Sequence, residues 1–175
     1  NVCRFLLSGV LLVSGFVKLA DPMGMVYKLQ AYATHWALDV DDLWLKMTAV
    51  IIGIIELQIG VYLLLGIRRR TSAWVTLLLM LSFLLLSIYL YIDGGIADCG
   101  CFGAALDLSP GATLVKNVLL TLISVYVVMY PQRMRRLVTE RNQGVATVYV
   151  FAYGCVLSLY SLHYLPFVTF TDYRV

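Results

Sequence analysis

Two cysteines separated by a single residue are the part of the sequence best suited to chemistry. They lie in the segment Asp98-Cys99-Gly100-Cys101-Phe102-Gly103. In a compartment that favours disulfides, paired thiols become structural bridges or partners in disulfide exchange. A bridge between Cys99 and Cys101 closes a very small ring, and strain in such a ring makes a disulfide more oxidising and easier to reduce. Gly100 and Gly103 supply the backbone freedom that this turn requires, so the segment predicts thiol–disulfide exchange.

Two other interpretations of the cysteine pair remain open. The bridge would pin the loop in a purely structural role, although so short a ring removes little chain entropy. A metal site is the second alternative, but zinc needs four ligands and the nearby sequence offers two thiolates and the carboxylate of Asp98. We therefore expect redox exchange and no bound metal.

Two lysines near the ends of apolar segments are candidate partners of the cysteine pair. Lys18 lies near the end of the first segment, and Lys116 lies about two helical turns after Pro110 in the fourth. A nearby ammonium favours the thiolate, which is the form that attacks a disulfide. The alternative is that each lysine extends towards water and phosphate, and this alternative is weaker for Lys116, which lies deeper in its segment.

Glu56 lies near the middle of the second apolar segment. A carboxyl group at this depth of a bilayer is costly and tends to face a partner or a wet cavity. We expect Glu56 to pair with Lys18 or Lys116, or to relay protons to a quinone bound between the helices. The alternative is structural: one half of a buried pair, or a protonated residue that joins two helices.

Membrane-spanning helices must position these residues. Of the 175 residues, 61% are apolar and 13% are charged, against about 45–50% and about 25% in soluble domains. The apolar residues form runs long enough to cross a hydrocarbon layer, which takes about 20 residues. We expect an all-α integral membrane protein with spans at about 2–19, 43–66, 72–92 and 111–130, and a less apolar fifth span at about 145–162.

The expected spans divide the chain into two parts. Residues 1–130 form a four-helix transmembrane core, and residues 131–175 add a basic cytoplasmic loop, the fifth span and an outer tail. Residues 23–38 are too few and too polar to cross a bilayer. Their apolar side chains recur at helical spacing, which predicts a helix lying in the membrane interface.

The arginines predict the orientation of the chain. They gather in two alternate loops and at the start of the first span: Arg68, Arg69, Arg70, Arg133, Arg135, Arg136, Arg141 and Arg4. Loops rich in Lys and Arg stay in the cytoplasm, so we expect the N-terminus inside, the C-terminus outside and the cysteine segment on the outer face. No basic surface is interleaved with exposed aromatic residues, so we expect no nucleic-acid partner.

The cysteine segment at the outer end of the third span resembles the methylamine-utilisation membrane protein family (MauE), within the wider DoxX-like group. Similar family features close the first span and lie within the second: Gly15, Lys18, Asp21, Pro22, Glu56 and Gly60. The resemblance covers roughly residues 2–130. It implies a four-helix core in the bacterial cytoplasmic (inner) membrane and a role in disulfide formation or maturation of exported proteins, often beside a thioredoxin-like partner in the periplasm.

We therefore expect an accessory thiol–disulfide oxidoreductase embedded in the lipid bilayer. Cys99 and Cys101 would exchange disulfides with an exported substrate or a periplasmic thioredoxin-like protein. Lys116 and Lys18 would favour the thiolate, Glu56 would serve an internal polar site, and a quinone is a candidate acceptor for reoxidation of the pair. The alternative is a non-catalytic membrane subunit or anchor that recruits a soluble enzyme, with the Cys-Gly-Cys turn shaping a docking loop.

Overall fold

Helices build the fold in the computed structural model, which describes residues 2–93, 109–130 and 137–164. Within these residues the chain forms six α-helices and one short 3-10 turn, with no β-strand. In chain order the elements are α1 (Val2–Ala20), α2 (Pro22–His35), α3 (Asp42–Leu65), α4 (Arg69–Asp93), α5 (Pro110–Met129), η2 (Glu140–Asn142) and α6 (Gln143–Tyr164). The predicted all-helical fold is confirmed.

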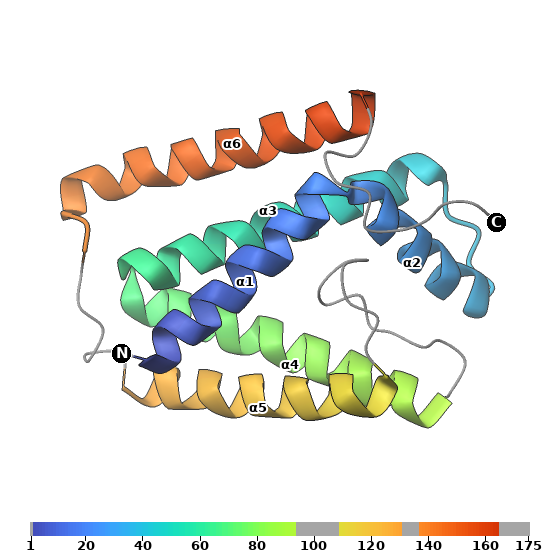
Figure 1. Ribbon diagram of the computed structural model, residues 1–175, viewed down its shortest axis with the longest axis horizontal. Helices are drawn as coiled ribbons and strands as arrows, with labels where there is room; N and C mark the ends of the chain where they lie inside the picture. The colour runs from blue at the N-terminus through green and yellow to red at the C-terminus, as the bar shows by residue number, and fades with distance from the viewer. Residues whose placement is uncertain (1, 94–108, 131–136, 165–175) are drawn as a thin grey trace.

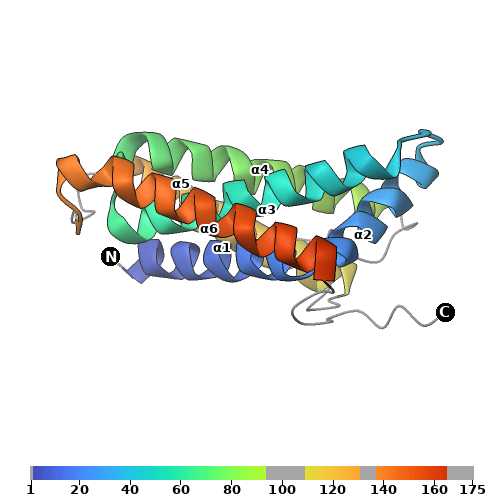
Figure 2. The ribbon, with the colours of Figure 1, turned by 90° about the horizontal axis from the view of Figure 1, so that it is seen from above.

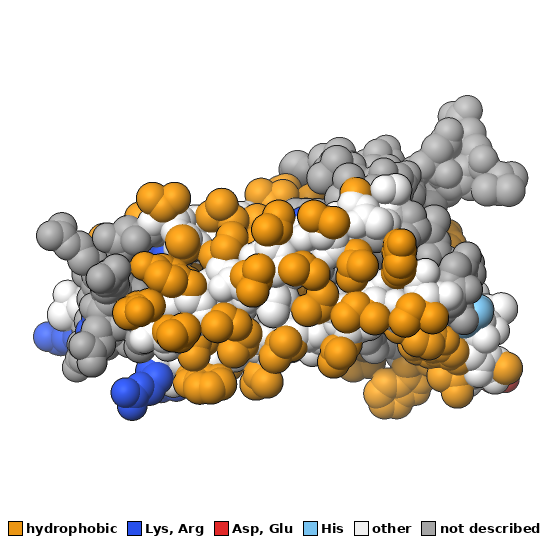
Figure 3. Space-filling model, turned by 90° about the horizontal axis from the view of Figure 1, so that it is seen from below, with side chains coloured by type: hydrophobic (Ala, Val, Ile, Leu, Met, Phe, Trp, Pro, Cys, Tyr) orange, Lys and Arg blue, Asp and Glu red, His pale blue; other side chains and the backbone are white. Residues whose placement is uncertain are grey.

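Five of the described helices, all but α2, are long and apolar enough to cross a bilayer. They contain 19 to 25 residues, which at about 1.5 Å per residue gives about 28 to 38 Å, against a hydrocarbon layer about 30 Å thick. Figure 3 shows one face of the molecule covered by hydrophobic side chains along its length, with Lys and Arg gathered near one end. Soluble monomers rarely expose so large an apolar surface. The chain is therefore a multi-pass membrane protein, as predicted.

Local sequence signals explain where the spans begin and end. The hydroxyl of Ser109 accepts a hydrogen bond from the backbone N–H of Ala112 at 3.4 Å, and Pro110 follows in the first turn of α5. This arrangement caps a helix start and places proline where its missing N–H is not needed. α3 ends at Leu65, and the next residue, Gly66, has a φ of 70°, in the left-handed region that glycine adopts readily.

α2 covers one end of the bundle (Figure 1). It begins after Asp21, whose carboxylate accepts a hydrogen bond from the backbone N–H of Gly24 at 3.1 Å. Its buried face presents Met25 and Val26 to Leu45 of α3. The segment predicted to lie in the membrane interface is thus a helix with one face packed on the bundle.

The spanning helices pack as two pairs, α1 with α3 and α4 with α5, and α6 lies outside α1 and α3 (Figures 1 and 2). Buried apolar side chains join the two pairs: Leu7, Leu11, Ile59, Leu63, Met80 and Leu120. The contacts of α6 include polar ones near both of its ends. Ser161 donates a hydrogen bond to the backbone carbonyl of Ala20 at 2.9 Å, and the hydroxyls of Tyr62 and Thr147 lie 2.8 Å apart.

Glycines permit a close approach of α1 and α3. A Cβ atom at Gly15 would lie 2.5 Å from the backbone nitrogen of Leu57, and one at Gly53 would lie 2.9 Å from the side chain of Leu19. Small residues allow helix backbones to approach in this way within membranes, where van der Waals contact and hydrogen bonds drive association. The α1–α3 pair is therefore the most tightly constrained part of the fold.

Gly15→Ala is expected to push α1 away from α3 and to destabilise the protein by about 1–3 kcal/mol, the typical effect of overpacking. The measurement is thermal unfolding of the purified protein in detergent. Gly9→Ala is the matched control, because a Cβ at this position of the same helix meets nothing within 4 Å. Equal melting temperatures for the two variants would contradict the close approach.

Candidate functional site

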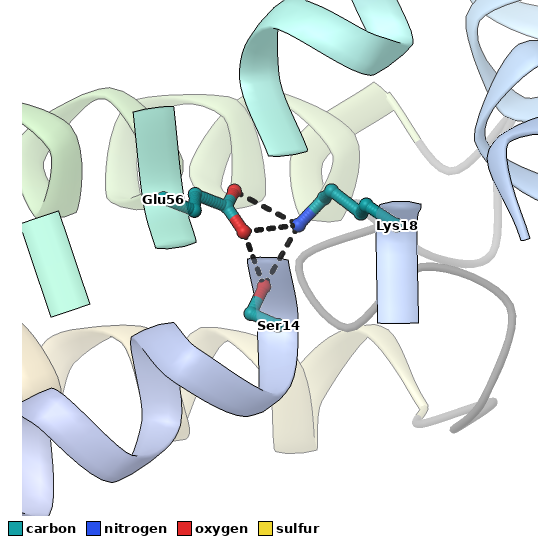
Figure 4. Close-up of polar contacts among 3 residues, drawn as sticks. All are labelled: Ser14, Lys18 and Glu56. Atoms are coloured by element: carbon teal, nitrogen blue, oxygen red, sulfur yellow. Dashed lines mark hydrogen bonds and ion pairs between the residues drawn. The ribbon is translucent and has the colours of Figure 1, made fainter. Parts of the chain in front are cut away.

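An ion pair is buried inside the bundle between α1 and α3 (Figure 4). The ammonium nitrogen Nζ of Lys18 lies 2.8 Å from each carboxylate oxygen of Glu56. Ser14 donates its hydroxyl proton to Oε2 of Glu56 over 2.6 Å and accepts a hydrogen bond from Lys18 over 2.8 Å. Lys18 and Glu56 are both 0% exposed. The three side chains form a polar cluster that is closed to lipid and to bulk water.

Helical spacing and close packing bring this cluster together. Ser14 and Lys18 are four residues apart on α1 and therefore lie on the same face of the helix. That face meets α3 at Gly53, where a Cβ atom would lie 3.3 Å from the Cβ of Lys18. Because a larger residue at Gly53 would crowd Lys18, glycine here allows the lysine to reach Glu56.

Neither charge would be stable in this position alone. A single charge in a low-dielectric interior carries a penalty of several kcal/mol, and removal of one partner of a buried pair typically costs about 3–5 kcal/mol. The two carboxylate oxygens and the Ser14 hydroxyl offer three acceptors for the three N–H bonds of the ammonium. The ring centroid of Phe83, on α4, lies 5.7 Å from Lys18 Nζ, within the range of a cation–π contact. The cluster therefore links α1, α3 and α4.

The structure places the two candidate lysines differently. Lys18 is one of the two partners that the sequence left open for Glu56, and it is wholly buried, so it does not extend towards the membrane surface. Lys116 lies half-buried on α5. It lines a cavity of about 10 Å³ together with Ser14 and Asn117. Lys116 is thus close to the cluster, whereas Lys18 is the ion-pair partner.

A second polar cluster joins α4 and α5. The side-chain amide of Asn117 donates to the hydroxyl of Ser87 and to the backbone carbonyl of Phe83, the latter at 3.3 Å. Thr121 donates to the backbone carbonyl of Asn117 at 2.7 Å. The sequence patterns did not indicate that Ser14, Ser87 or Asn117 belongs to a site. The signal that could have found Ser14 and Asn117 is a pair of polar residues four apart in an apolar span, because such a pair shares a helix face.

The predicted cysteine site, Asp98 to Gly103, lies outside the described residues. The helices on either side of it, α4 and α5, have their adjoining ends at the same end of the bundle as α2 (Figure 1). Cys3 on α1 and Cys155 on α6 are free thiols and are half-buried. Among the described residues, no group of three or more His, Cys, Asp or Glu side chains is placed to hold a metal ion.

Lys18→Met and Glu56→Leu are each expected to destabilise the protein by about 3–5 kcal/mol, because each leaves one buried charge without its counter-ion. The double variant should recover a large part of this loss, since it removes both charges. Thermal unfolding in detergent of the four proteins in this double-mutant cycle measures the coupling.

Lys46→Met is the control for the loss of a lysine charge. Lys46 lies 3.8 Å from Asp42 in an exposed ion pair on α3, and such pairs typically contribute about 0–1 kcal/mol. Additive losses in the Lys18 and Glu56 variants would rule out an energetic coupling between the two charges.

Comparison with known protein families assigns most of the chain to one family. A model of the family described as methylamine utilisation protein MauE matches residues 1–130 of the 175-residue chain. No curated protein and no solved structure matches the chain. The matched range contains α1 to α5, the Lys18–Glu56 pair and the cysteine segment, whereas α6 follows it. The chain therefore belongs to the MauE family of membrane proteins, which is linked to methylamine utilisation.

Proposed function

We propose that this protein is an accessory thiol–disulfide oxidoreductase of the bacterial cytoplasmic membrane, which assists disulfide formation or maturation of exported proteins. The observation that carries the proposal is the Cys99-Gly100-Cys101 sequence between two spanning helices, α4 and α5. Because a segment that joins two spans lies at an aqueous edge of the membrane, we expect a thioredoxin-like partner or an exported substrate to contact the two thiols there.

The arginines support an outward-facing cysteine loop. Arg68–Arg70 lie at the turn between α3 and α4, at the same end of the bundle as Arg4 near the start of α1 (Figure 1). The backbone N–H of Leu137 donates to the carbonyl of Leu65 at 2.9 Å, which brings the segment leading to Arg141 to this end too. The positive-inside rule assigns this end to the cytoplasm, and the α4–α5 loop to the opposite side.

The proposed reaction transfers two electrons from a substrate dithiol to the Cys99–Cys101 disulfide. A substrate thiolate attacks one sulfur of the bridge, the S–S bond breaks and a mixed disulfide forms. The second substrate thiol then attacks the mixed disulfide, which leaves the substrate oxidised and both cysteines as thiols. The two thiols must pass their electrons to a further acceptor, either the disulfide of a thioredoxin-like protein or a quinone in the bilayer.

Lys116 is the cation proposed to favour the cysteine thiolate. It lies six residues after Pro110, where the loop rejoins the helix. Lys18 is held by Glu56 in the interior, so we assign that pair to keeping the helices in register around Lys116. Asp98, Gly100, Phe102 and Gly103 would shape the loop itself.

The first experiment tests the cysteine pair and its orientation in a Cys3→Ser/Cys155→Ser background. A thiol label that cannot cross membranes, applied to intact cells, is expected to modify Cys99 and Cys101 only after reduction. A further Cys99→Ser or Cys101→Ser change should trap a mixed disulfide with a partner protein, because the resolving thiol is missing.

The outcomes separate three possibilities. Labelling that requires cell lysis would overturn the orientation. Thiols that are labelled without reduction and trap no partner would overturn the redox function. The alternative, a non-catalytic subunit or anchor that recruits a soluble enzyme, would then account for the docking loop.

Lys116→Met is expected to slow disulfide exchange by about tenfold, because loss of the ammonium raises the pKa of the cysteine thiol that leaves when the substrate thiolate attacks the bridge, and a thiol of higher pKa leaves more slowly. Lys116→Arg is the matched control, since it keeps the positive charge at nearly the same position. The measurement is the rate of disulfide transfer from the oxidised protein to a dithiol peptide, with thermal unfolding recorded for both variants. Equal rates in the two variants would remove Lys116 from the proposed mechanism.

A further inference from the structure

A stripe of exposed side chains, three of them tyrosines, runs along one side of α6. α6 packs on α1 and α3 and lies at the outside of the molecule (Figures 1 and 2), so another molecule can approach this side. The tyrosine stripe consists of Tyr149, Tyr153, Val156 and Tyr160, which are between 48% and 73% exposed. Their spacing of four, three and four residues keeps them on one face of the helix. The same spacing is typical of two helices that pack side by side.

Tyr153 lies in the middle of α6, which runs from Gln143 to Tyr164. At about 1.5 Å per residue its Cα atom is about 15 Å from the nearer end of the helix, and half of a hydrocarbon layer about 30 Å thick is also about 15 Å. A tyrosine side chain is too short to carry its hydroxyl from this depth to the headgroups. The Tyr153 hydroxyl therefore lies among lipid tails wherever no other protein covers it.

This hydroxyl makes no hydrogen bond with any described residue. Smaller exposed hydroxyls on the spans find an acceptor in their own helix. Thr48 donates to the backbone carbonyl of Trp44 at 2.8 Å, and Ser82 donates to a carbonyl of α4 at 3.0 Å. A tyrosine hydroxyl stands too far from its own backbone for such a bond, and an unpaired polar group is costly in lipid, where no water replaces the missing partner. Tyr153 therefore needs a partner from another molecule.

We infer that the tyrosine stripe is the interface of a homodimer, in which α6 packs in parallel against α6 of a second copy. Two copies that cross the bilayer in the same direction are related by a two-fold axis along the membrane normal, so the two Tyr153 hydroxyls lie at the same depth. A hydroxyl is both a donor and an acceptor, so these two can hydrogen-bond to each other. A two-fold interface requires such self-complementarity. Lipid tails would cover the rings but offer no acceptor.

The area of the stripe predicts a reversible dimer. Full burial of a tyrosine covers about 150–250 Å², so the exposed parts of the three tyrosines offer roughly 350 Å² per copy. This is less than half of the about 800 Å² per partner in a stable interface, and exposed neighbours such as Val145 and Val156 extend it. The inference does not depend on the proposed disulfide exchange, in which α6 has no part.

Tyr153→Phe tests the hydroxyl contact, because it removes only the oxygen and keeps the ring. Full-length protein with a donor or an acceptor fluorophore at the N-terminus is mixed in liposomes, and energy transfer is followed as added lipid dilutes the protein. Tyr153→Phe is expected to raise the dissociation constant of the dimer about three- to tenfold, the effect of one lost hydrogen bond. Tyr91→Phe, at a side chain 57% exposed on α4 and outside the stripe, is the matched control and should leave the constant unchanged.

Two valines of α6 test where the interface lies. Val148 and Val156 are both 67% exposed, but only Val156 belongs to the stripe. Val156→Trp is expected to raise the dissociation constant about tenfold or more, since the larger ring separates the two helices, whereas Val148→Trp should leave it unchanged. Energy transfer in the unsubstituted protein no greater than random encounters produce would overturn the dimer. So would a constant that Tyr153→Phe leaves unchanged, or one that both tryptophan variants raise equally.

A benzophenone amino acid in place of Tyr149 identifies what covers the stripe in cell membranes. Illumination is expected to join two copies of the full-length chain, with both crosslinked peptides coming from α6 in mass spectrometry. Crosslinks to lipid alone, or to a different membrane protein, would overturn the inference.

Discussion

Lys18 and Glu56 meet at 2.8 Å in a region of the bundle that neither lipid nor bulk water reaches. Because either charge alone would be costly there, α1 and α3 must keep the height and rotation at which the two side chains touch. A shift of one residue along either helix would turn a side chain by about 100° and separate the pair. Gly15 and Gly53 make the required approach possible, since a side chain at either position would collide with the facing helix.

The second helix pair is joined to the first through the same cluster. Phe83 of α4 lies close to the ammonium of Lys18, and Ser14 lies between the carboxylate and the small cavity that reaches α5. On the far side of that cavity, Asn117 holds α5 to α4 through Ser87. Polar contacts of this kind suit a bundle in a bilayer, because lipid tails are as apolar as the helix surfaces and provide little hydrophobic drive for association.

The polar network involves helices α1, α3, α4 and α5 but not α6. The four helices that carry it, α1, α3, α4 and α5, all lie within the range matched by the MauE family, and so does the cysteine segment. α6 follows that range and lies outside the network, with most of its side chains exposed. The polar network holds the helices in place, whereas the disulfide exchange is proposed for the Cys99-Gly100-Cys101 segment between α4 and α5.

Composition and run length by themselves determined the membrane class and the spans, because crossing a bilayer demands a minimum length of apolar residues whatever the neighbours are. The same local reasoning identified Glu56, whose depth in a span requires a partner. The choice of Lys18 over Lys116 as that partner was decided only by the tertiary structure, since it depends on how two helices are rotated against each other. Ser14, Ser87 and Asn117 are ordinary polar residues in the sequence. They acquired a role only through neighbours 30 to 42 positions away in the chain, which packing brings together and local patterns do not record.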